Sequence, residues 1–250
     1  MPGAEPMRSL EPADLLGIWE RGAGLHSIDR ALLTLAWALP ERNDAELASL
    51  ALGERDSLLL EVRRATLGDR LEAHEPCPAC GEQVEFEVSC ATLLERATTP
   101  TGEWTIEHDG VRLTLRALDS RDAAAAVAAG ADVDAARAVL LERAVVAAEL
   151  DGRAIAVGEL SDEVTAAVSS SLATRDAGAE LLLDVACPAC DAAWKAILDV
   201  AAFVWTELAA RAERVLQDVH LLARAYGWSE GQVLALGDSR RAAYLAMAGG

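Results

Sequence analysis

Two identical Cys-Pro-Ala-Cys tetrapeptides are the residues of this sequence best suited to chemistry. They place Cys77 near Cys80 and Cys187 near Cys190, and 106 residues separate the two pairs. A C-x-x-C turn lets two thiolates reach one ion, and the proline inside it stiffens the turn. Because one pair supplies only half of a tetrahedral shell, we expect all four cysteines to bind one structural Zn²⁺ per chain.

The segments that lead into the two tetrapeptides are similar as well. Residues 71–76 precede the first and residues 182–186 the second, and both have the pattern of an extended chain. We interpret the two as the knuckles of one split zinc ribbon that carries a domain inserted between them. Gly81 can adopt the left-handed backbone that usually follows a knuckle, whereas Asp191 in the equivalent place tolerates it less well.

A thiol-disulfide redox site is the competing interpretation, because C-P-x-C also occurs where a cysteine at a helix N-terminus has a lowered pKa. Against it, Cys80 is followed by Gly81 and a strand-like pattern, and no βαβ pattern surrounds either pair. Reduced cysteines with a purely structural role are a third interpretation. His74 could replace a thiolate, but four cysteines already complete the shell, so we expect a surface histidine there and a small buried residue at Cys90.

Nothing else in the sequence has the pattern of an active site. A shell closed by four protein ligands leaves no open position for water or substrate, so such a metal would not catalyse a reaction. The sequence has no phosphate-binding glycine loop, no G-x-S-x-G elbow and no H-E-x-x-H motif. Acidic pairs such as Glu85 and Glu87 suit one solvated strand face. We therefore expect no catalytic residue and a protein that is not an enzyme.

The composition of the chain limits where the protein can be located and which kinds of partner it can bind. The chain has 250 residues, 52% of them hydrophobic, which is enough to fill a core. Its 22 basic and 41 acidic residues give a net charge of −19, which disfavours nucleic acid and anionic membranes as partners. The N-terminal residues lack the pattern of a secretory signal, and no apolar run is long enough to span a membrane. We expect a cytoplasmic protein, with incorporation into a larger assembly left open.

Helical patterns precede and follow the cysteine pairs. Apolar residues recur at helical spacing from Pro12 to Gly68, and Asn43 with Glu46 forms a possible capping box, so three or four helices are expected. After the second pair, apolar residues from Trp194 to Leu208 lead into a long amphipathic helix that ends near Gly227. Two short helices follow, opened by Ser229 and Asp238.

The segment between the cysteine pairs combines a hairpin with helices. Residues 103–107 and 111–116 read as strands joined across Asp109-Gly110, a favoured tight-turn dipeptide. Possible N-caps then precede three helical stretches; the caps are Asp119, Asp132 and Ser161, and the stretches are 120–129, 133–149 and 162–174.

The resulting fold class is α+β, mainly α-helical, and organised in four parts. The predicted parts are an N-terminal helical block (1–68), a split zinc ribbon (69–96 and 175–200), an inserted β-hairpin with helices (97–174) and C-terminal helices (201–250).

The C-terminal block resembles a pattern in baseplate and hub-assembly proteins of contractile phage tails and extracellular contractile injection systems. The similar stretches are 203–208, 219–223, 226–230, 234–236, 240–241 and 244–245. The stretches 19–22, 29–32 and 141–145 look like the same family. The resemblance implies a non-enzymatic, chaperone-like role in assembling a contractile particle, beside its baseplate, spike, tube or tape-measure proteins.

Two other function classes stay open at this point. A thiol-disulfide redox protein would use the Cys-Pro-Ala-Cys motifs in exchange chemistry. A zinc-ribbon adaptor could act in transcription or translation, although the acidic balance disfavours direct contact with nucleic acid.

Overall fold

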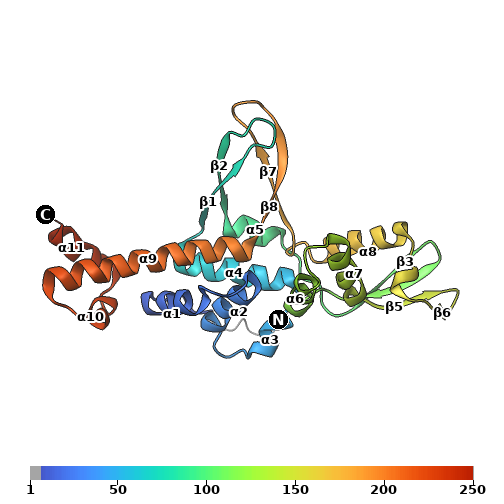
Figure 1. The fold of residues 1–250 in the computed structure, drawn as a ribbon, viewed down its shortest axis with the longest axis horizontal. Coiled ribbons are helices and arrows are strands. Elements are labelled where there is room, and N and C mark those ends of the chain that lie inside the picture. The colour runs from blue at the N-terminus through green and yellow to red at the C-terminus, as the bar shows by residue number, and fades with distance from the viewer. Residues whose placement is uncertain (1–6, 250) are drawn as a thin grey trace.

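A computed structural model describes residues 7–249 of the chain, and it has an elongated shape (Figure 1). A helical core lies in the middle, with two β-hairpins projecting from one side of it. The segment between the hairpins lies at one end of the molecule, and the last two helices lie at the other. Residues 1–6 and 250, which belong to the first and last predicted parts, lie outside the described residues.

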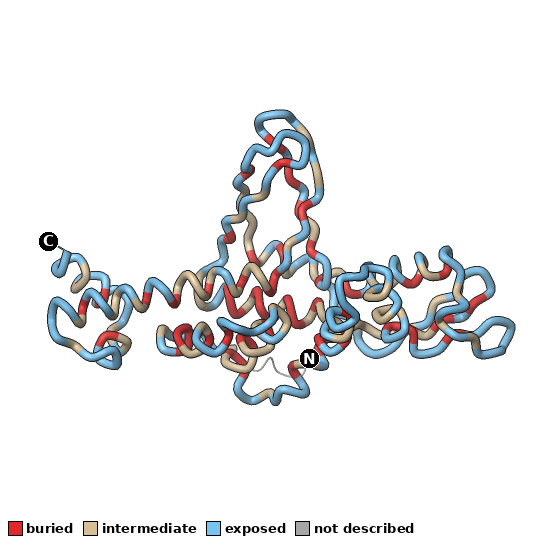
Figure 2. Tube along the Cα trace, in the orientation of Figure 1, coloured by how far each residue is buried: buried red, intermediate tan, exposed pale blue. Residues whose placement is uncertain are grey.

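The helical core is built by the N-terminal helices and the long helix α9. Its elements are α1 (Pro12–Gly22), α2 (Ser27–Ala38), α3 (Asp44–Ala48), α4 (Leu52–Leu67) and α9 (Val200–Tyr226). The first four fulfil the expectation of three or four helices before Gly68. Helices α1, α2 and α4 all pack on α9, and Leu35, Leu59 and Leu208 on these helices are fully buried. Figure 2 shows that buried residues concentrate in this part of the molecule. Burial of these apolar faces stabilises the core.

A capping box fixes the start of α3, and a glycine allows α1 to pack closely against α9. The predicted capping box of α3 is present, because Asn43 Oδ1 accepts the N–H groups of Ala45 and Glu46, both at 3.0 Å. Helix α1 ends at Gly22, where an added Cβ would lie 2.3 Å from the Trp205 ring. Only a glycine lets α1 approach α9 this closely.

Two antiparallel hairpins rise from the core (Figure 1). The first consists of β1 (Arg70–Pro76) and β2 (Gln83–Ser89), followed by α5 (Cys90–Arg96), and the second consists of β7 (Leu181–Ala186) and β8 (Ala193–Leu198). From the sequence, the apolar residues Trp194 and Ile197 were expected to lead into the long helix. In the structure they lie on β8, and α9 begins only at Val200. Pairing with β7 decides this, since the register joins Val185 to Trp194.

The segment between the hairpins has its own sheet and its own small core. Its elements are β3 (Trp104–His108), β4 (Val111–Leu115), α6 (Ser120–Ala128), α7 (Val133–Ala144), β5 (Val145–Leu150), β6 (Arg153–Ala154), the 3₁₀ helix η1 (Val157–Glu159) and α8 (Asp162–Arg175). The sheet order is β3-β4-β5-β6, and its buried cluster includes Leu113, Leu115 and Val168. The turn predicted at Asp109-Gly110 is present, and both residues have positive φ, 48° and 76°.

One predicted helix in this segment was too long. The stretch 133–149 was expected to be helical throughout, but α7 ends at Ala144 and residues 145–150 form β5. This strand pairs with β4, joining Leu113 to Ala148. Alanine-rich sequence favours a helix locally, and the pairing available along β4 overrides that preference.

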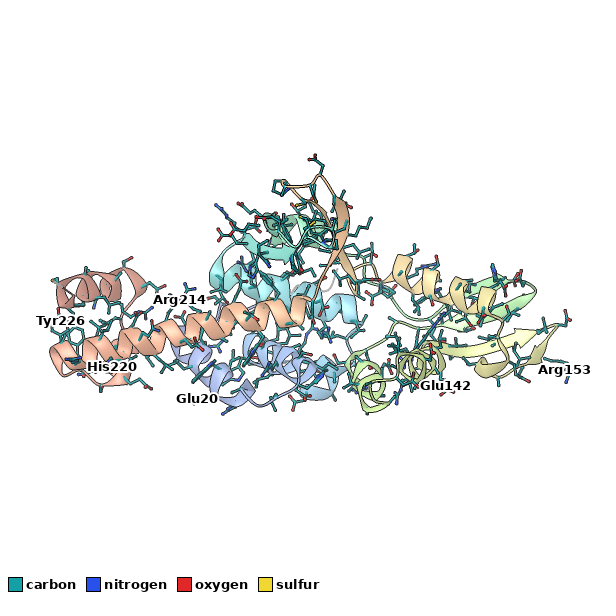
Figure 3. All side chains as sticks on the ribbon, turned by 45° about the horizontal axis from the view of Figure 1, so that its top comes forward. Glu20, Glu142, Arg153, Arg214, His220 and Tyr226 are labelled. Carbon is teal, nitrogen blue, oxygen red and sulfur yellow. The ribbon has the colours of Figure 1, made fainter. Side chains whose placement is uncertain are left out.

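The C-terminal helices pack on the far end of α9. They are α10 (Glu230–Leu234), opened by the predicted capping box of Ser229 and Gln232, and α11 (Asp238–Ala248), whose N-cap is Gly237 rather than Asp238. The rings of Tyr226 and Trp228 stack with their centroids 4.8 Å apart, and the ring of Tyr244 contacts both edge-to-face, at 5.6 and 4.8 Å. Figure 3 shows Tyr226 and His220 at this end of α9.

A buried carboxylate joins the helical core to the segment between the hairpins. Asp176 ends α8 and is only 6% exposed. Its Oδ2 accepts the N–H of Gly53 at 3.2 Å, while its Oδ1 is buried without a partner among the described residues. An added Cβ on Gly53 would lie 2.8 Å from the backbone nitrogen of Ala179, so the two backbones are in direct contact here. Burial raises the pKa of Asp176 to about 6, and the N–H of Gly53 lowers it only in part.

We predict that Asp176→Asn stabilises the fold at neutral pH. A folded pKa above the ordinary value of 3.8 means that the wild-type contribution is full below pH 3.8 and is lost as the pH rises through about 6. The neutral amide retains an acceptor for Gly53 and removes the buried charge. The free energy of unfolding should rise by about 1–2 kcal/mol at pH 7, after allowance for screening, and by much less at pH 4. Urea denaturation at both pH values measures this.

Asp162→Asn is the matched control, because it neutralises an exposed carboxylate at the opposite end of the same helix. Its effect should stay within about 0.5 kcal/mol at both pH values. Equal destabilisation by Asp176→Asn at pH 4 and pH 7 would contradict the assignment of a costly buried charge.

Candidate metal centre

The two Cys-Pro-Ala-Cys turns have the same backbone hydrogen bonds. In the first, the N–H of Cys77 donates to the carbonyl of Glu82 at 2.8 Å, and the N–H of Gly81 donates to the carbonyl of Cys77 at 2.9 Å. In the second, the equivalent bonds from Cys187 to Ala192 and from Asp191 to Cys187 are 2.9 and 3.0 Å long. Each turn sits between the two strands of its hairpin, so the similar sequences do form two similar turns.

The second turn does not depart from the first at Asp191. Its φ is 58°, against 79° for Gly81, so both residues take the left-handed conformation. Asp191 therefore adopts the conformation that it is expected to tolerate less well than glycine. Aspartate is one of the few residues that tolerate this conformation, and the turn hydrogen bonds hold it there.

The two turns meet at the ends of the hairpins, and their four sulfur atoms form one group. All four lie within 4.8 Å of one another. Across the hairpins, Cys77 Sγ lies 3.7 Å from Cys190 Sγ, and Cys80 Sγ lies 3.6 Å from Cys187 Sγ. A tetrahedron with metal–sulfur bonds of about 2.3 Å has edges of about 3.8 Å, so these spacings suit a single tetrahedral ion.

Burial and hydrogen bonding differ within the group. Cys77 and Cys187 are buried, whereas Cys80 and Cys190 are exposed. Burial raises the pKa of the Cys77 thiol, but the N–H groups of Cys80 and Ala79 outweigh it, so its pKa falls to about 7. The N–H of Glu82 favours the Cys80 thiolate, yet hydrogen bonding to Cys190 and partial desolvation raise the pKa of Cys80 to about 12. One thiolate forms easily, and further ones need a neighbouring cation.

The other two candidate ligands lie outside this group. His74 is exposed on β1, opposite Glu85, as expected for a surface histidine. Cys90 is fully buried at the start of α5, as expected for a small core residue. Neither turn leads into a helix, since β2 follows Cys80 and β8 follows Cys190. The helix N-terminus that activates cysteines in many redox sites is therefore not present at either turn.

Sequence reasoning missed the ion pair that anchors the first hairpin. The guanidinium of Arg63 on α4 binds both carboxylate oxygens of Glu207 on α9, each at 2.8 Å. It also donates to the carbonyl of Gly68, just before β1. The signal was a charged residue at a core-facing helix position, because Arg63 follows the buried Leu59, Leu60 and Val62. Bidentate arginine–carboxylate pairs are geometrically specific, so the pair fixes where the hairpin leaves the core.

Fold and site together define a class of protein: a mixed α+β chain whose small antiparallel hairpins bring four cysteines into a group compatible with a metal ion. The family model described as T4 bacteriophage base plate protein matches residues 26–204 of the chain. The match runs from just before α2 into the beginning of α9 and includes both hairpins and the segment between them. The chain belongs to this family and is a phage baseplate protein, as the sequence resemblance implied.

Membership of the family implies contact with other baseplate components. No curated protein and no solved structure matches the chain. Among the described helices, none is both long enough and apolar enough to cross a membrane.

We predict that substitutions of Gly81 and Asp191, the residues that follow the two cysteine turns, change the free energy of unfolding in opposite directions. Gly81→Ala adds a Cβ at a φ of 79° and should lower the free energy of unfolding by about 1 kcal/mol. Asp191→Gly relieves the left-handed aspartate and should be neutral or stabilising by up to about 1 kcal/mol. Gly231→Ala in α10, where an added Cβ meets nothing within 4 Å, is the control and should not destabilise. Urea denaturation measures all three variants, and an unchanged Gly81→Ala protein would contradict the strained turn.

Proposed function

We propose that the chain is a non-enzymatic assembly protein of the baseplate and hub region in a phage-tail-like contractile injection particle. The observation that carries the proposal is the family match over residues 26–204. The elongated shape supports it, because separate surfaces at the two ends and at the hairpins can contact different components (Figure 1). A chaperone-like role during assembly and a place in the finished particle are the two forms of this function.

The proposed partners are the baseplate, spike, tube or tape-measure proteins of such a particle. The net charge of −19 supports protein partners over nucleic acid or anionic lipid, since both of these would be repelled. Assembly would begin in the cytoplasm, where the components are made.

We further propose that Cys77, Cys80, Cys187 and Cys190 hold one structural Zn²⁺ per chain. Four thiolates are the donor set that structural zinc prefers, and the sulfur spacings suit its tetrahedral shell. The ion would tie the two hairpins together as a split zinc ribbon and would leave no position open for substrate. Its binding would contribute directly to folding, because the four thiolates converge only in the folded chain.

The zinc proposal also gives the four parts of the chain a physical meaning. In it, the ribbon (69–96 and 175–200) closes the segment 97–174 into a loop that begins and ends at one metal. Before and after it, helices α1, α2 and α4 pack on α9 and form the support from which the hairpins project.

Elemental mass spectrometry of protein purified without chelator tests the metal. We expect one zinc per chain, which Cys187→Ser should lose together with about 10 °C or more of thermal stability. Cys90→Ala is the control, because it removes a cysteine outside the sulfur group, and it should keep its zinc.

Metal-free wild-type protein would contradict the zinc site. If that protein also exchanged disulfides, the lowered pKa of Cys77 would favour the redox interpretation instead.

Deletion of the gene from a cell that makes the particle tests the assembly role. We expect electron micrographs to show few or no complete baseplates, and wild-type protein to restore them. Mass spectrometry of purified particles then separates a component, which remains, from a chaperone, which does not. Normal numbers of intact particles in the deletion strain would contradict the role.

A further inference from the structure

A groove of about 380 Å³ opens where both hairpins meet the beginning of α9. Its floor is apolar and includes Phe86 of β2, Leu183 of β7 and Phe203 of α9. Ile197 of β8 also lines it and is 64% exposed, which is unusual for so large an apolar side chain. The volume lies in the range of pockets that take a ligand or a few side chains.

Carboxylates surround this apolar floor. Those that line the groove are Glu72, Glu75, Asp199 and Glu207. Among the described residues of the lining, His74 is the only one with a basic side chain, and there is no lysine or arginine. An apolar groove with acidic edges is complementary to a cationic, amphipathic partner.

Part of this negative charge is not neutralised within the chain. Glu207 is paired with Arg63 at 2.8 Å, and Glu72 shares Arg70 with Glu87. Glu75 and Asp199, in contrast, have no cationic partner in the described part of the chain. Within the described part of the chain, the side chain of Asp199 accepts the N–H of Ala202 and so caps the start of α9. Glu75 is half-buried and Asp199 is exposed beside the apolar floor of the groove, so a cation from another molecule would be favoured there.

The net charge of the chain disfavours several of the molecules that could bind in the groove. A second copy of the chain would bring a further net charge of −19 to an acidic groove. Nucleic acid and anionic lipid are disfavoured for the same reason. A segment with lysine or arginine beside large apolar side chains satisfies both the floor and the edges.

We propose that the groove between the hairpins and α9 binds an amphipathic segment of another particle component, in which lysine or arginine residues flank large apolar side chains. The apolar side chains fill the floor beside Phe203 and Ile197, and the cations approach Glu75 and Asp199. The proposal rests on the assembly role in one respect, namely that the partner is another component of the particle. Its binding surface is defined by the fold alone.

Photo-crosslinking in a cell that assembles the particle identifies the segment. A benzoylphenylalanine replaces Ile197 in the full chain, and a second variant carries it at Val133, which is 78% exposed on α7 outside the groove. We expect position 197, but not position 133, to link to a segment of another component in which basic residues outnumber acidic ones. Links only to a second copy, only to acidic or purely polar segments, or to nothing would overturn the proposal.

Binding of a synthetic peptide with the identified sequence then tests the chemistry. Fluorescence anisotropy should show affinity weakened at least about tenfold by Ile197→Glu and by Glu75→Lys. The matched controls are Val133→Glu and Glu142→Lys, which make the same changes outside the groove, and they should weaken it less than about twofold. Figure 3 shows Glu142 on α7, away from the hairpins. Equal weakening by the control variants would reduce the contact to general charge attraction and overturn the proposal.

The same variants separate this proposal from the assembly role. If Ile197→Glu abolishes peptide binding while normal particles form, the groove binds its segment and the contribution of that contact to assembly is refuted. If the wild-type chain fails to bind the peptide while the deletion strain lacks baseplates, the groove proposal is wrong and the assembly role stands.

Discussion

Four thiols from two turns, 106 residues apart in the sequence, meet within 4.8 Å, and the arrangement of both hairpins depends on this convergence. A two-stranded hairpin alone is marginally stable, since it has little apolar surface to bury. Here each hairpin packs on the helical core at the end opposite its turn, through Leu71 in the first hairpin and Leu181 in the second. The turns of the two hairpins contact each other through the four cysteines. The segment between them is thereby held at both of its ends.

The position of the hairpins on the core depends on a second interaction, the ion pair of the buried Arg63 with the half-buried Glu207. It joins α4 to α9 and, through Gly68, fixes the first residue of the hairpin region. A buried charge is costly unless its hydrogen bonds are satisfied, and here Arg63 is satisfied by a bidentate carboxylate and a carbonyl. Glu207 itself lines the proposed binding groove, so the shape of the groove depends on this ion pair and on the way the two hairpins meet at their turns.

The family match and the structure divide the chain in an informative way. The match ends at residue 204, close to the beginning of α9, whereas the helix continues to Tyr226 and carries α10 and α11 on its far end. The shared part therefore contains the hairpins, the four cysteines and the segment between the hairpins. The C-terminal extension adds a buried Arg241, paired with Asp218 and Asp238, and a cluster of three aromatic rings.

The sequence by itself determined the features that depend on neighbouring residues. Capping boxes at Asn43 and Ser229, the turn at Asp109-Gly110 and the two cysteine turns all follow from hydrogen bonds and backbone preferences within a few residues. Only the tertiary structure decided that residues 145–150 form a strand and that Arg63 is a core residue. Each of these is set by partners distant in sequence, and the energy of pairing or packing with them outweighs the local preference of the residue.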